Sequence, residues 1–124
     1  MSTINALLKS FTHAFRGLKL AYKTERSFRI QVAAFCVIIV LIVLVPLQLW
    51  EQSILLLVTM FVLVLELLNS SLERLVDLAK PRQHAYAGDI KDLMAGGVLV
   101  AATFALVLGL LILGPKIADL ATHL

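Results

Sequence analysis

The sequence predicts an all-α integral membrane protein, and two observations support this fold class. Hydrophobic residues make up 60% of the 124 residues and charged residues 15%, against roughly 45–50% and about 25% in soluble domains, and mean hydropathy is +0.96. Three stretches are also long enough to cross a bilayer, which takes about 20 apolar residues. Because so small a domain cannot bury this much apolar surface in water, a soluble enzyme, a disordered tail and a disulfide-stapled module are excluded.

Residues 1–29 predict an amphipathic helix on the membrane surface, followed by a short lead-in to the first span. Apolar residues recur every three to four positions on one side: Ile4, Leu7, Leu8, Phe11, Phe15, Leu18 and Tyr22. The other side carries Lys9, His13, Arg16 and Lys23. Such a helix buries its apolar side in the interface and sets its basic side among anionic headgroups. A simple anchor is the alternative, and no nucleic acid partner is expected because the basic residues flank membrane spans.

Three transmembrane spans are expected at residues 30–50, 52–72 and 93–115, in a single membrane domain of residues 1–124. The first and third carry no formal charge, and Glu66 alone interrupts the second. Residues 73–92 are expected to form a cytoplasmic loop. Proline disfavours a helical conformation at the residue before it, so Pro81 should end the second helix near Ala79, and a new helix should begin near residues 87–89.

The basic residues predict the orientation of the chain. Ten of the eleven lysines and arginines precede the first span or lie between the second and third, which leaves Lys116 alone on the other side. By the positive-inside rule, the amino terminus and the loop at residues 73–92 face the cytoplasm and the carboxyl terminus lies outside.

A polar stripe on the second span is the strongest functional signal. A carboxylate in hydrocarbon costs about 2.5–3.5 kcal/mol, so Glu66 is a candidate functional residue by default. On a helix, Glu66, Glu73 and Asp77 fall within about 40° of one another, with Asn69 and Ser70 on either side. Glu66 would lie in the inner third of a core about 30 Å thick, with Glu73 at headgroup level. This arrangement suits chemistry between a lipid hydroxyl and a water-soluble cosubstrate.

Motifs for several other chemistries are absent from the sequence. There is no Gly-Lys-Ser/Thr phosphate loop, no nucleophile elbow and no Cys/His cluster for zinc. Carboxylates that could hold Mg²⁺ at nucleotide phosphates remain, which favours phosphoryl transfer. The residues alone leave three alternatives open: a small proton-coupled transporter subunit that relays through Glu66, a structural adaptor with Glu66 as oligomerisation contact, and ordinary surface charge for Glu73, paired with Arg74 or Lys80.

Residues 66–77 resemble the signature of the small prokaryotic diacylglycerol kinases, a family that includes the Gram-positive undecaprenol kinases. The family pattern E-x-x-N-[ST]-x-x-E-x-x-x-D is met by Glu66, Asn69, Ser70, Glu73 and Asp77. Without gaps, the family's loop histidine and Lys-Asp pair fall on His84, Lys91 and Asp92. Gly17-Leu18 and residues 24–29 resemble its amino-terminal segment, so the resemblance extends from Lys9 to Lys116.

The resemblance implies a homotrimer in the bacterial cytoplasmic (inner) membrane that phosphorylates a lipid alcohol, with ATP as cosubstrate and Mg²⁺ as cofactor. Its catalytic residues would be Glu66 as general base, Asn69 and Lys91. The metal ligands would be Glu25 and Glu73, and the nucleotide-binding residues Glu25, Glu73, His84, Lys91, Asp92 and His13. The lipid substrate would contact Glu66, Ser70, Phe28, Arg29 and Ala95. Glu25 rests on the resemblance alone.

The departures from the family pattern concern the first helix and the substrate. Ala6 stands where the family often has an arginine, and His13 stands in place of an aromatic residue. Residues 24–30 and 114–116 look more like undecaprenol kinases, whereas Gln31 departs from the family's histidine and Asn69-Ser70 resembles the enterobacterial diacylglycerol kinases. Undecaprenol is therefore slightly favoured, and a diacylglycerol kinase that makes phosphatidic acid is the alternative.

Overall fold

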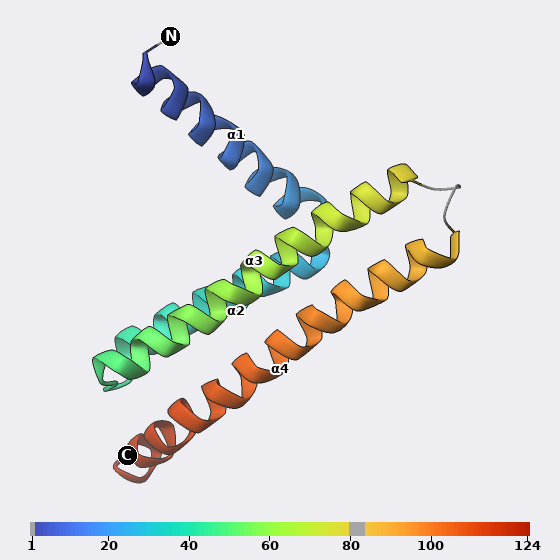
Figure 1. Ribbon diagram of the computed structural model, residues 1–124. Coiled ribbons are helices and arrows are strands. Elements are labelled where there is room, and N and C mark those ends of the chain that lie inside the picture. Colours follow the sequence, from blue (N-terminus) through green and yellow to red (C-terminus); the bar gives the residue numbers. More distant parts are fainter. Residues whose placement is uncertain (1, 80–83) are drawn as a thin grey trace.

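The computed structural model describes residues 2–79 and 84–124, apart from the side chain of His84, and every element in these ranges is a helix (Figure 1). The four helices are α1 (Thr3–Thr24), α2 (Arg26–Leu44), α3 (Leu49–Ala79) and α4 (His84–Thr122). The last three are long and apolar enough to cross a membrane. The all-α fold with three potential spans is therefore confirmed.

The first helix is separate from the other three. Ser2 caps α1 by accepting a hydrogen bond from the backbone N–H of Asn5 at 3.3 Å. The helix ends at Glu25, a single extended residue (φ −111°, ψ 108°) that leads directly into α2. Figure 1 shows α1 pointing away from the bundle, and its apolar side chains are consequently exposed.

A break at residues 45–48 separates α2 from α3, within the segment expected to form the first span. Val45, which precedes Pro46, has an extended backbone (φ −92°, ψ 136°), as steric conflict with a following proline dictates. The helix α3 then begins with a side-chain cap, because the Glu51 carboxylate accepts the Gln48 backbone N–H at 2.9 Å.

The connection between α3 and α4 is shorter than predicted. The helix α3 ends at Ala79, as predicted, but α4 begins at His84, three residues before the earliest expected start. Most of the predicted loop at residues 73–92 is therefore helical, and Pro81 lies outside the described residues. The helix α4 continues through Pro115 to Thr122, although a proline there removes one backbone hydrogen bond.

The helix α3 is central to the packing, since it contacts both α2 and α4 extensively. Its buried positions recur at helical spacing and include several polar residues: Glu51, Leu55, Thr59, Val62, Glu66, Ser70 and Val76. At one end of this face lies the hydrophobic core, formed by Val45, Leu55, Ile112 and Leu113. The polar stripe predicted on the second span thus begins on the packed face of α3, with Glu66 only 6% exposed.

Candidate functional site

The helix α3 carries the centre of the candidate site. Glu66 and Ser70 are buried, and Asn69 and Glu73 are half-buried, because these residues lie one or two turns apart near the packed face. The Asn69 Nδ2 donates to Glu73 Oε1 at 3.5 Å. The Asn69 Oδ1 is buried and has no hydrogen-bond partner among the described residues. Buried polar atoms are rarely left unpaired, so this oxygen indicates a place where a ligand would bind.

Glu25 approaches this centre from the junction between α1 and α2. Its carboxylate Oε1 pairs with Arg74 Nη2 of α3 at 3.5 Å, and the same nitrogen donates to the Thr24 hydroxyl at 2.9 Å. The fold therefore brings Glu25 into contact with α3, the helix that carries Glu66 and Glu73, although Glu25 lies in a distant part of the sequence.

These residues suit a metal ion that arrives with a nucleotide. Within residues 2–79 and 84–124, no three His, Cys, Asp or Glu side chains form a ready-made metal cluster. Mg²⁺ does not require one, because one or two carboxylates, waters and substrate phosphates usually complete its shell. Glu25, Glu73 and the unpaired Asn69 Oδ1 supply oxygen donors. The donor set therefore fits Mg²⁺ bound together with a phosphate group.

Lys91 and Asp92 lie on α4, where the helix begins to pack beside α3. The Lys91 Nζ lies 2.6 Å from the Asp77 carboxylate Oδ1 of α3, and Asp92 is exposed. Asp77 belongs to the predicted stripe, and the structure gives it a partner that its spacing did not reveal. This ion pair connects the last turns of α3 with the first turns of α4.

The predicted lipid-contact residues are distributed over three helices. Phe28 is buried on α2, and Ala95 is exposed on α4. Arg29 donates from Nη1 to the carbonyl oxygens of Tyr22 at 2.8 Å and Lys23 at 3.2 Å. It therefore caps the carboxyl end of α1, a common role for arginine at a helix end, which sequence analysis did not predict.

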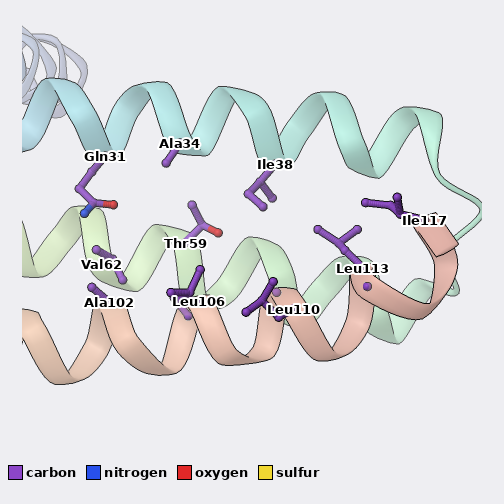
Figure 2. A pocket seen from close by; sticks show the side chains of 13 residues that line it. Gln31, Ala34, Ile38, Thr59, Val62, Ala102, Leu106, Leu110, Leu113 and Ile117 are labelled. Carbon is purple, nitrogen blue, oxygen red and sulfur yellow. The ribbon is translucent and has the colours of Figure 1, made fainter.

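A cavity of about 410 Å³ lies between α2, α3 and α4 (Figure 2). Its walls are apolar or small except for Gln31 and Thr59, and the Thr59 hydroxyl already donates to the Leu55 carbonyl oxygen at 2.6 Å. Val62 lines the cavity and lies one turn before Glu66 on the packed face of α3. The cavity therefore reaches to within one helical turn of Glu66, which does not itself line it.

Two predicted nucleotide residues are not placed at this centre. His13 is exposed on α1, and its separation of 12 residues from Glu25 amounts to about 18 Å of helix rise. The side chain of His84 lies outside the described residues.

Arg74 is a residue of the site whose partner sequence analysis did not predict. It was considered only as a partner for Glu73, one position before it, whereas the structure pairs it with Glu25 and gives Glu73 a contact with Asn69. Its position next to Glu73 marks Arg74 as a residue near the candidate site. Its contact with Glu25, however, joins residues 49 positions apart, and no local pattern in the sequence predicts such a contact.

Comparisons with known proteins identify one family. The sequence profile of the prokaryotic diacylglycerol kinases matches residues 12–113. The undecaprenol kinase of Bacillus subtilis (strain 168) is 40% identical over 114 residues, which cover 92% of this chain and 93% of that protein. A diacylglycerol kinase of Synechocystis is 37% identical over 115 residues, or 92% of this chain and 66% of that longer protein. The diacylglycerol kinase of Escherichia coli (strain K12) is 27% identical over 101 residues, or 82% and 83%.

Proposed function

Because this chain belongs to the prokaryotic diacylglycerol kinase family and is a lipid kinase, we propose that it phosphorylates undecaprenol with ATP at the inner face of the bacterial cytoplasmic membrane. The single observation that carries the proposal is the buried Glu66 on the packed face of α3. A carboxylate at membrane depth is expensive. The polar residues Asn69, Ser70 and Glu73, which follow it on the same helix, support an enzymatic role rather than a packing role.

In the proposed reaction, Glu66 is the general base. It accepts the proton of the lipid hydroxyl while that oxygen attacks the γ-phosphorus, and the bond to the bridging oxygen of ADP breaks. Glu25 and Glu73 hold the metal–nucleotide complex, together with the Asn69 oxygen that has no other partner. Mg²⁺, when bound, neutralises charge on the phosphate oxygens, since phosphoryl transfer requires positioning and electrostatic stabilisation more than covalent chemistry.

Residues at the inner ends of the helices complete the proposed nucleotide site. Lys91 would neutralise phosphate charge from its place opposite Asp77, with Asp92 and His84 nearby on α4. His13 would reach the nucleotide only if α1 folds back toward the bundle, so its role rests on the family resemblance alone.

The choice of undecaprenol rests on the relatives and on the cavity. The relative at 40% identity that matches over nearly its whole length is named an undecaprenol kinase. The apolar cavity between α2, α3 and α4 supports binding of a hydrocarbon chain, since ligand sites combine apolar walls with a few polar groups. Diacylglycerol is the second candidate, because the relative at 37% identity is named a diacylglycerol kinase.

The proposed orientation places α1 on the cytoplasmic leaflet. The ten basic residues before the first span and between the last two support a cytoplasmic amino terminus and an outer carboxyl terminus. The exposed apolar residues of α1 support its insertion among the headgroups.

The proposed assembly is a homotrimer built around α3. Away from its packed face, α3 exposes a seam with alternating steps of four and three: Leu57, Phe61, Val64, Leu68, Ser71, Leu75 and Leu78. A repeat of 3.5 residues is typical of helices that wrap around one another. Leu75 and Leu78 lie beyond the predicted span, and an exposed apolar patch outside the lipid is typical of a protein interface. The number three comes from the family resemblance.

A transfer assay tests the proposed function. We would supply the purified protein in detergent–lipid micelles with Mg²⁺, labelled ATP and either undecaprenol or diacylglycerol. Glu66→Gln should lose at least about a hundredfold in rate, as expected when a general base is removed. The matched control is Glu51→Gln, which changes another buried glutamate at the opposite end of the same helix and should retain transfer.

The outcomes of this assay separate the candidates. Faster labelling of undecaprenol supports the proposal, and faster labelling of diacylglycerol supports the second candidate. If the assembled wild-type protein labels neither lipid, or if Glu66→Gln remains active, the proposed mechanism is wrong.

A further inference from the structure

The junction between α1 and α2 consists of a single residue, Glu25. Its extended backbone is the one non-helical residue between the two helices. The helix α1 contacts α2 far less than α3 contacts α2 or α4. The direction of the Glu25 carboxylate is therefore determined by contacts at the junction itself rather than by a surrounding core.

Two arginines hold this junction from different sides. Arg29 of α2 donates to the last carbonyl oxygens of α1 and fixes the end of that helix. Arg74 comes from α3 and contacts the Thr24 hydroxyl at 2.9 Å and the Glu25 carboxylate at 3.5 Å. Of the two, Arg74 thus connects the junction to the helix that carries Glu66 and Glu73.

This contact is poorly suited to a purely stabilising role. The Arg74 side chain is 50% exposed and that of Glu25 26% exposed, and exposed ion pairs contribute little to folding stability. The contact with Arg74 does restrict the Glu25 carboxylate, which would otherwise move with α1. Side chains that orient a metal ligand typically change metal affinity or activity by about 10–100-fold.

We propose that Arg74 is a positioning residue for the metal–nucleotide complex, an inference that rests on the proposed function. Through Thr24 and Oε1 of Glu25, the Arg74 guanidinium holds the Glu25 carboxylate against α3, the helix that carries Glu73. The second oxygen, Oε2, would remain for the metal ion. Glu25 and Glu73 can then bind one Mg²⁺ without first ordering the junction.

A binding titration without lipid tests this role directly. We would follow Mn²⁺ binding by electron paramagnetic resonance, using the full-length protein in micelles with a non-hydrolysable ATP analogue. Arg74→Ala should weaken Mn²⁺–nucleotide binding by about tenfold. In the transfer assay it should raise the Mg²⁺ concentration for half-maximal rate by a similar factor, with a smaller change in kcat. A merely structural contact would not produce this separation.

Three further variants make the test specific. Arg74→Lys keeps the charge but loses the guanidinium nitrogen Nη2 that makes both contacts, so it should recover part of the affinity. Thr24→Val removes one of the two contacts and should have a smaller effect in the same direction. Arg26→Ala removes an equal charge from the exposed residue next to Glu25, and it should change affinity by less than about twofold, as surface substitutions usually do.

The inference is overturned if Arg74→Ala binds Mn²⁺ as tightly as the wild type, or if Arg26→Ala causes the same loss. Should Arg74→Ala not fold, Arg74→Lys and Thr24→Val decide by the same criterion. Failure of the proposed function would look different, because a wild-type protein that binds Mn²⁺–nucleotide but labels no lipid contradicts the function and leaves the Arg74 comparison intact.

Discussion

At the scale of single residues, the candidate site contains a polar atom that folding alone does not explain. Asn69 Oδ1 is buried without a partner in the described structure, although its amide nitrogen contacts Glu73. An unsatisfied buried acceptor costs about 1–3 kcal/mol. Residues that lower the stability of the folded state in this way are expected at functional sites, and Asn69 is interpreted as one of them.

Asn69→Leu tests this interpretation. The substitution removes the unpaired oxygen while it keeps a similar shape, so the thermal midpoint should be unchanged or higher. Phosphate transfer should fall by at least about tenfold, because an oxygen donor near the metal is lost. Thermal unfolding in detergent and the transfer assay measure the two effects. A lower midpoint with normal transfer would show that Asn69 serves packing only.

The ion pair between Lys91 and Asp77 gives a second prediction at this scale. If Lys91 contacts phosphate, Lys91→Met should lose at least about a hundredfold in kcat/KM, since charge stabilisation of a transferred group is worth this much. Asp77→Asn leaves the lysine in place at 2.6 Å from the changed side chain, so it should lose less than about tenfold. Steady-state kinetics at varied ATP concentration measures kcat/KM for both variants. An equal loss of kcat/KM in the two variants would indicate that Lys91 and Asp77 act as a unit.

At the scale of helices, α3 is fixed differently at its two ends. Its first turn is capped by the Glu51 carboxylate, which also lies 3.8 Å from Lys116 Nζ of α4. Lys116 follows Pro115, so the continuation of α4 past the proline is what brings the amine to α3. This end also contains the hydrophobic core, whereas the other end carries the candidate site.

Lys116→Met should therefore affect stability and not activity. The Glu51 side chain is 9% exposed and that of Lys116 34%, so loss of the pair should cost about 1 kcal/mol, between the values for exposed and buried pairs. The expected result is a lower thermal midpoint with unchanged transfer, and a smaller difference from the wild type at 1 M salt, where a Debye length of about 3 Å screens the charges. Reduced transfer at full stability would contradict this separation of the two ends.

At the scale of the whole molecule, an isolated chain leaves much of α3 uncovered. The seam from Leu57 to Leu78 is exposed, and Leu78 near the end of α3 is 83% exposed. Lipid tails can cover the part inside the membrane, but the part beyond the predicted span would face water or headgroups. Self-association around this seam would bury it and would leave the candidate site on the other face.

Disulfide cross-linking tests this assembly. In a Cys36→Ser background, which removes the single native cysteine, Leu68→Cys should form a disulfide between neighbouring chains under mild oxidation, as facing seam positions approach within about 4–7 Å. Leu99→Cys, at a leucine on α4 that is even more exposed (67% against 53% for Leu68), is the control and should react much less. Cross-linking through Leu99 instead of Leu68 would place the interface on α4.

Composition and hydrophobic patterning determined the class of this protein, its helical content, three potential spans and the end of α3 at Ala79, because these follow from local chemistry along the chain. The spacing of Glu66, Asn69, Glu73 and Asp77 predicted a polar stripe, since residues on one helix share a geometry that sequence alone specifies. The role of Glu25 as a metal ligand was predicted only from the family resemblance, because a junction of one residue has no periodic pattern.

Only the tertiary structure decided which neighbours these residues have. In the structure, Glu66 lies on the packed face of α3, Arg74 pairs with Glu25 rather than Glu73, and Asp77 pairs with Lys91. The tertiary structure also extended α4 to His84, because packing against α3 stabilises helix in a segment whose local sequence predicted a loop. The physical reason is common to all of these cases: the energy of a contact between distant segments depends on how whole helices pack, which no local pattern in the sequence encodes.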